Sequence, residues 1–153
     1  MSRRIGLVGC VKAKRGHDSP ARDLYVSPLF AGRRRWVEQT CDEWWILSAR
    51  FGLVHPDTVL FPYETSLTTA RAEQRRLWGR ATAAAILDEV NPAPGDVVEI
   101  HAGAAYTDFG LVEVLELSGV TVELPAEHLG IGDQLHLYAA GPRAARAVSA
   151  RAS

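Results

Sequence analysis

The chain has 153 residues, of which 47% are hydrophobic and 23% are charged, and its formal net charge is -1. These numbers fit one globular domain over residues 1–153 with an adequate core. The near-zero charge excludes a protein whose whole surface coats nucleic acid, but it is compatible with a local basic pocket.

Cysteine usage and hydropathy predict a cytoplasmic protein with no membrane partner. Cys10 and Cys41 lack CxxC spacing, which suits a reducing compartment and gives neither a disulfide framework nor a zinc knuckle. No apolar run approaches the roughly 20 residues that span a bilayer. The N-terminal apolar stretch is too short for a secretion signal.

The first half of the chain predicts two buried strands joined by a helix. Residues 4–10 form an apolar run without alternation, which is typical of a strand buried on both faces. Ser27 and Pro28 predict a helix start, because serine caps and proline fits the first turn. This helix should run to about Asp42. Its expected inner face comprises Leu29, Arg33, Trp36, Val37 and Thr40. A second buried strand is expected over residues 44–48, followed by a long loop.

The second half predicts alternating helices and strands. A long helix is expected over residues 68–90, ended by the Asn-Pro-Ala-Pro-Gly segment. Its inner stripe should be Leu77, Ala81, Ala84, Leu87 and Val90. The elements expected after it are a strand at 96–101, a helix at 104–118, a strand at 120–124 and a helical segment from Gly132 to Ala140 and beyond.

This alternation predicts an α/β domain, a three-layer α/β/α sandwich around a mostly parallel, Rossmann-like sheet of four to five strands. In open sheets of this kind, ligands bind beyond the carboxyl ends of the strands. Four polar or glycine-rich segments should meet there. They are residues 10–14, 48–51, 101–106 and 125–134. We therefore expect a single site at this edge.

The first of these segments and the loop after it offer cations and a tyrosine. Lys12, Lys14 and Arg22 form a natural anion site, with Tyr25 nearby; the alternative is a solvated basic loop. The GxxxxGK[ST] order of a Walker loop is missing, so NTP hydrolysis is not expected. Cys10 is either a thiol of lowered pKa or a buried structural cysteine.

The second segment leads into a loop of polar and aromatic residues. Ser48 and Arg50 directly follow a strand and could hold a phosphate or carboxylate. Alternatively, Arg50 pairs with Asp57 or Glu64 and fixes the loop. Glu64, next to Tyr63, either stabilises a positively charged sugar-like transition state or caps the next helix.

The last two segments add small residues and an amide. Gly103 lies in a turn that lets a ligand approach the backbone, and Tyr106 follows one turn into a helix; the alternative is tight strand–helix packing. Gln134 could read the edge of a base. His101 is expected to be buried and hydrogen-bonded. The histidines show no metal spacing, and no cofactor fingerprint is present, so neither a metal nor a cofactor is predicted.

Two longer motifs carry a resemblance. Residues 47–67, LSARFGLVHPDTVLFPYETSL, resemble the LSxxxGLxxPxxxxxPYxxxL motif of the YaaA-like peroxide-stress proteins. Residues 20–30, PARDLYVSPLF, resemble the PAxxLYxSxLF segment of a related small bacterial and phage family of unknown function. That family also has a strand ending in Cys before a Lys, a GxxY turn and a GxGxQ-type segment. The resemblance covers roughly residues 9–138.

The resemblance implies a uracil-DNA-glycosylase-like α/β fold and a nucleotide or modified nucleoside whose N-glycosidic bond is cleaved or exchanged. Glu64 would then stabilise charge on the sugar, with Asp57 as its substitute. The phosphate would be held by Arg50, Lys12 and Arg22, and the base or sugar by Tyr63 and Tyr106.

YaaA-like proteins carry extra segments that form a basic DNA-binding cleft. This chain is shorter and has a net charge of -1, which favours a ligand of nucleotide size. One alternative is a non-catalytic nucleotide- or nucleic-acid-binding protein linked to stress response or nucleic-acid modification. Another is a binding protein for a small anionic metabolite. The oligomeric state stays open, and a homodimer is common among tryptophan-rich α/β domains of this size.

Overall fold

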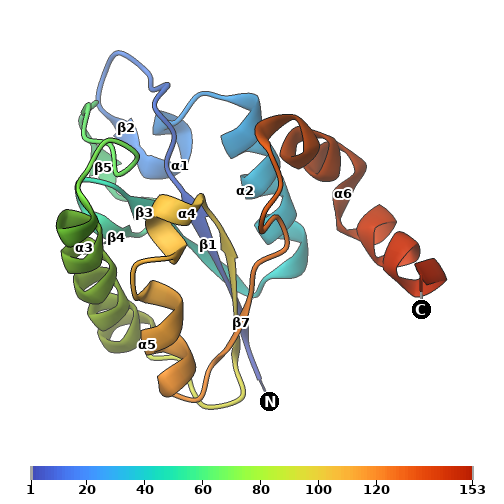
Figure 1. The fold of residues 1–153 in the computed structure, drawn as a ribbon. Coiled ribbons are helices and arrows are strands. Elements are labelled where there is room, and N and C mark those ends of the chain that lie inside the picture. Colours follow the sequence, from blue (N-terminus) through green and yellow to red (C-terminus); the bar gives the residue numbers. More distant parts are fainter. Residues whose placement is uncertain (1, 153) are drawn as a thin grey trace.

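A computed structural model describes the backbone of residues 2–152 and the side chains of residues 2–147. Its centre is a five-stranded sheet in the order β4-β3-β1-β6-β7 (Figure 1). The strands are β1 (Arg4–Gly9), β3 (Glu43–Ser48), β4 (Gly52–Val54), β6 (Val97–His101) and β7 (Thr121–Glu123). All neighbours pair in parallel except β3 and β4, which are antiparallel. The predicted mostly parallel sheet of a mixed α/β fold is therefore confirmed.

The four predicted strands match β1, β3, β6 and β7 to within one or two residues at each end. The central strands are buried because parallel sheets are covered by their crossover helices. Ile5, Leu7 and Ile46 are fully buried, and Ile100 is nearly so. An apolar run without alternation is therefore the correct signature of these central strands.

The first predicted helix is α2 (Pro28–Thr40), and it begins where the sequence predicts. The backbone N–H of Phe30 donates to Ser27 Oγ at 3.0 Å, which makes Ser27 the N-cap. The last helix, α6 (Ile131–Ala152), lies beside α2 (Figure 1). Gly141, with φ of 88°, interrupts α6 and separates its final turns from the rest.

The long helix predicted after the loop is shorter and rotated. It consists of α3 (Ala72–Ala85) and a π-helical turn (Ile86–Val90). The predicted inner stripe is wrong at Leu77, which is 55% exposed. It is also wrong at Ala81 and Ala84, which are exposed, whereas Leu87 is half-buried and Val90 is buried.

The buried face of α3 carries small residues, Gly79, Thr82 and Ala83. A Cβ on Gly79 would lie only 2.8 Å from the carbonyl oxygen of Phe109. The backbones approach so closely there that only small residues fit between them, whereas Trp78 is half-buried and packs against Tyr106. Close approach, rather than hydropathy, decides which face is inside.

The remaining differences are short elements that leave no period in the sequence. The helix predicted over 104–118 is two helices, α4 (Ala104–Thr107) and α5 (Leu111–Leu117). The loop after β3 contains β4 and β5 (Val59–Leu60). The polar loop before α2 contains β2 (Ser19–Pro20), which pairs with β5, and α1 (Ala21–Leu24). Among the described residues, no helix is long and apolar enough to cross a membrane.

The orientation of α3 can be tested by truncating one exposed residue of α3 and one buried residue of the π-helical turn that continues it. Leu77→Ala should change the free energy of unfolding by no more than about 0.5 kcal/mol, because the side chain is exposed. Ile86→Ala should cost about 2–5 kcal/mol, because Ile86 is fully buried. Urea unfolding of both variants measures the difference. A larger loss for Leu77→Ala would contradict this orientation.

Candidate functional site

The carboxyl ends of β1, β3 and β6 meet, and the side chains that follow them touch. The backbone N–H of Cys10 donates to the carbonyl of Leu47 at 2.9 Å. The Cys10 sulfur accepts from the N–H of Ala49 at 3.3 Å and lies 3.1 Å from the Tyr106 hydroxyl. Segments about 40 and 100 residues apart in the chain are thus joined at one thiol. We call this region the carboxyl edge.

A chain of buried hydroxyls lies beside this thiol. Ser48 Oγ donates to the Tyr63 hydroxyl at 2.7 Å, and the Tyr63 and Tyr25 hydroxyls are 2.6 Å apart. Burial raises the pKa of Tyr25 to about 12 and that of Tyr63 well above its usual range. Both phenols are therefore protonated at neutral pH. They can donate hydrogen bonds but cannot act as bases.

Lys14 covers these tyrosines. Its ammonium group lies 4.5 Å from the ring centroid of Tyr63 and donates to the backbone carbonyls of Val11 and Lys12. Burial lowers the pKa of Lys14, while the charges of Cys10 and Glu64 act in the opposite direction. Glu64 is exposed, and its charge favours the protonated form of Lys14.

Arg33 is the most unusual side chain at the carboxyl edge. It is only 5% exposed, yet none of the ion pairs among the described residues includes it. It donates to the carbonyl of Gly9 at 3.4 Å and to Gln134 Oε1 at 3.2 Å, and its Nε–H has no partner. Burial lowers the pKa of Arg33, but an arginine stays protonated in proteins. A buried cation without a carboxylate partner is rare and points to an anion that is bound from outside.

Sequence reasoning placed Arg33 on the inner face of its helix without assigning it to the site. An arginine among apolar positions of a buried face was the available signal. Of the predicted site residues, the structure brings together Cys10, Lys14, Tyr25, Ser48, Tyr63 and Tyr106, and it places Gln134 against Arg33. No hydrogen bond or ion pair among the described residues joins Glu64 to them.

Other predicted site residues have different surroundings. Arg22 and Asp57 form an ion pair with each other, so their charges are mutually compensated. The alternative pairing of Arg50 with Asp57 or Glu64 is not found. Instead, the Arg50 guanidinium lies over the rings of Phe51 and Phe61, 5.6 and 5.1 Å from their centroids.

Lys12 and Gly103 are both exposed. The carbonyl of Lys12 accepts from Lys14, and nothing lies within 4 Å of the position that a Cβ on Gly103 would occupy. The backbone at Gly103 is therefore open to approach from solvent. Within residues 2–147, no group of His, Cys, Asp or Glu side chains could hold a metal ion.

A second polar chain runs through the core behind the carboxyl edge. His101 Nε2 lies 2.6 Å from Glu99 Oε1, and its Nδ1 lies 2.8 Å from the Tyr138 hydroxyl. Burial lowers the pKa of His101, against the effect of Glu99. Burial acts to raise the pKa of Glu99, but the hydrogen bonds from His101 and Arg4 hold it below its usual range. His101 is therefore neutral and donates from Nε2 to an ionised carboxylate, and the predicted buried, hydrogen-bonded histidine is confirmed.

These features define an α/β protein with a cationic, hydroxyl-lined cluster at the carboxyl ends of its parallel strands. The chain belongs to a family of unknown function, DUF6884, whose model matches residues 5–140. The matched segment contains every residue of the carboxyl edge described above. Comparisons with curated proteins and with solved structures gave no match.

The neutral state of His101 predicts a pH-dependent stability. Its pKa in the folded protein lies below the unfolded value near 6.5, so the unfolded state binds protons first as the pH falls. Above about pH 6.5, the titration of His101 does not reduce the free energy of unfolding. Below that pH, it lowers the free energy of unfolding by up to about 1.4 kcal/mol per pH unit. Urea unfolding between pH 7.5 and 5.5 measures this loss.

His101→Gln should be less stable at pH 7.5 but should lose less stability on acidification. His55→Gln is the matched control, because His55 is exposed. Equal acid sensitivity of wild type and His101→Gln would show that another group causes the loss.

Proposed function

We propose that the protein binds a nucleotide or modified nucleoside at the carboxyl edge and cleaves or exchanges its N-glycosidic bond. The observation that carries the proposal is the buried guanidinium of Arg33, which lacks a carboxylate partner. A phosphate would supply the missing negative charge and could accept two parallel hydrogen bonds. We also propose that the fold is a three-layer sandwich and that the protein is related to YaaA-like proteins.

Phosphate binding at Arg33 requires one local change. Gln134 Oε1 accepts from the guanidinium, while Gln134 Nε2 donates to the carbonyl of Leu129 at 2.8 Å. A phosphate oxygen would take the place of the neutral amide oxygen of Gln134. Hydrogen bonds between ions are stronger than those to neutral acceptors, so the exchange is favourable. Lys14 would provide a second cation.

The base would stack on Phe51 and Phe61 rather than on the tyrosines. These two rings are 40% and 45% exposed, and they meet edge to face with their centroids 5.5 Å apart. Tyr63 and Tyr106 are only 5% and 8% exposed, so each offers little ring surface. Exposed aromatic rings next to a cation are typical of surfaces on which bases stack.

The chemistry would depend on Glu64. Departure of the base from C1′ leaves positive charge on the sugar, and a nearby carboxylate stabilises that charge. Water then adds its oxygen to C1′, and its proton ends on the departing base; in an exchange, a second base replaces water. Glu64 suits this role better than Asp57, because Asp57 is already paired with Arg22.

One observation favours a non-catalytic alternative, a nucleotide-binding protein. The tyrosines of the hydroxyl chain are protonated and bonded to one another, so neither can act as a base. Glu64 would then only balance the charge of Lys14. A nucleotide would raise the melting temperature without releasing base.

The role of Arg33 is tested by Arg33→Met, with the exposed Arg35→Met on the same helix as control. Arg33→Met should bind 5′-nucleotides at least tenfold more weakly by calorimetry, which is about 1.4 kcal/mol. Its stability without ligand should equal or exceed that of wild type, because an apolar side chain replaces an unpaired buried charge. Unchanged nucleotide affinity in Arg33→Met would refute the phosphate site.

The role of Glu64 is tested by incubating the protein with a panel of nucleotides and separating free base by chromatography. Glu64→Gln should reduce base release by about 10²-fold or more. Glu116→Gln, at an exposed position on α5, should leave it unchanged. Unchanged base release by Glu64→Gln would show that Glu64 does not stabilise the charge on the sugar. Nucleotide binding by a wild-type protein that releases no base would favour the alternative function.

A further inference from the structure

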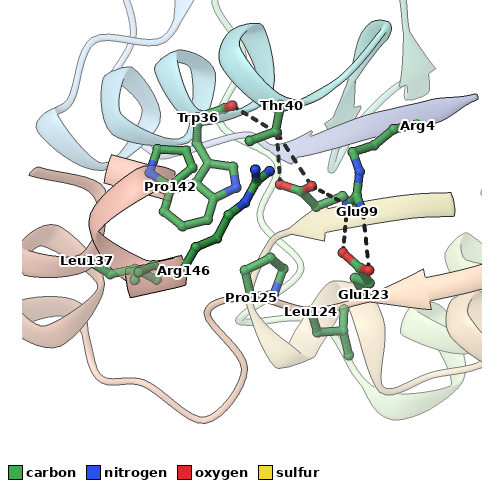
Figure 2. A pocket seen from close by; sticks show the side chains of 11 residues that line it. Arg4, Trp36, Thr40, Glu99, Glu123, Leu124, Pro125, Leu137, Pro142 and Arg146 are labelled. Carbon is green, nitrogen blue, oxygen red and sulfur yellow. Dashed lines mark hydrogen bonds and ion pairs between the residues drawn. The ribbon is translucent and has the colours of Figure 1, made fainter. Parts of the chain in front are cut away.

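A cavity of about 580 Å³ lies away from the carboxyl edge, between α2, α6 and the β6–β7 side of the sheet (Figure 2). Its lining combines four charged side chains with apolar ones. The charged residues are Arg4, Glu99, Glu123 and Arg146. None of the residues assigned above to the nucleotide site lines it. The volume is in the range of small-molecule sites.

One wall of the cavity has an excess of negative charge. Arg4 NH1 donates to Glu99 at 2.8 Å and to Glu123 at 2.6 Å, so one guanidinium serves two carboxylates (Figure 2). His101, the other partner of Glu99, is neutral because burial lowers its pKa. Thr40 adds a hydroxyl that donates to Glu99 at 3.3 Å. Arg4 is therefore shared by two carboxylates, and this wall carries one more negative charge than its own guanidinium balances.

A second guanidinium also lines the cavity. Arg146 follows the break in α6, and in the view of Figure 2 its guanidinium ends between the Trp36 ring and the Glu99 carboxylate. None of the ion pairs among the described residues includes Arg146. The rest of the lining is largely apolar. It belongs to Trp36, Leu124, Pro125, Leu137, Pro142 and Ala145.

We propose that this cavity binds a small zwitterion, an amino acid or dipeptide with apolar side chains. Its ammonium group would lie against Glu99 and Glu123, and its carboxylate against Arg146. The apolar side chain would pack among the apolar residues of the lining. A phosphorylated ligand would place its charge next to two carboxylates, so the cavity and the nucleotide site select different chemistry.

The break in α6 precedes three of the residues that this helix contributes to the cavity. Gly141 adopts a φ of 88°, and the segment from Pro142 onward, which carries Arg146, changes direction there. Pro142, Ala145 and Arg146 lie beyond residues 5–140, the segment that the family model matches.

The charge requirement is tested by calorimetry with L-leucine, L-phenylalanine and L-leucyl-L-leucine. L-leucinamide lacks the carboxylate and N-acetyl-L-leucine lacks the ammonium group. At least one zwitterion should bind, and both blocked compounds should bind at least tenfold more weakly than L-leucine or the dipeptide. No detectable binding of any zwitterion at millimolar concentration would overturn the proposal. Equal affinity for the blocked compounds would also overturn it.

Variants locate the binding site. Arg146→Gln and Glu123→Gln should each weaken zwitterion binding at least tenfold, and Arg143→Gln, an exposed arginine of the same segment outside the cavity lining, should not. Arg146→Gln should also remove the preference for L-leucine over L-leucinamide. Nucleotide affinity should stay unchanged in all three variants, which separates this site from the proposed function. Full zwitterion binding by Arg146→Gln would refute the assignment.

Discussion

The central constraint in this structure is an ionised carboxylate inside the core. Glu99 is 2% exposed and is compensated by partners from three different elements, Arg4 on β1, Thr40 on α2 and His101 on β6. Tyr138 of α6 completes the chain through His101. Removing one partner of a buried charge typically costs about 3–5 kcal/mol, because the remaining charge is left uncompensated. The sheet, α2 and α6 are therefore held together by polar contacts that must all be made at once.

This arrangement also decides the charge at both ends of the polar chain. Arg4 and His101 compensate Glu99, whereas Arg33 at the carboxyl edge has no carboxylate partner among the described residues. At the other end, Glu123 shares Arg4 with Glu99, and the cavity wall keeps an excess negative charge. Although the net charge is only -1, the carboxyl edge at Arg33 favours an anionic group and the acidic wall of the cavity favours a cationic one.

Local sequence patterns predicted the start of α2, the central strands of the sheet and much of the carboxyl edge. Ser27 and Pro28 located the start of α2, and unbroken apolar runs located the central strands, because capping and burial act on neighbouring residues. The rule that open sheets bind ligands beyond the carboxyl ends of their strands predicted that Cys10, Ser48 and Tyr106 lie at one edge. The face of α3 was predicted wrongly at Leu77, since backbone approach rather than hydropathy oriented that helix.

By itself, the sequence determined the alternation of strands and helices, the parallel sheet and the edge at which polar turns gather, because these follow from short-range periodicity and chain direction. Only the tertiary structure decided which charges are paired. Arg4 and Glu99 are 95 residues apart, and Arg33 and Gln134 are 101 apart. Coulombic compensation depends on distance in space and on burial, and neither quantity can be read from the order of residues along the chain.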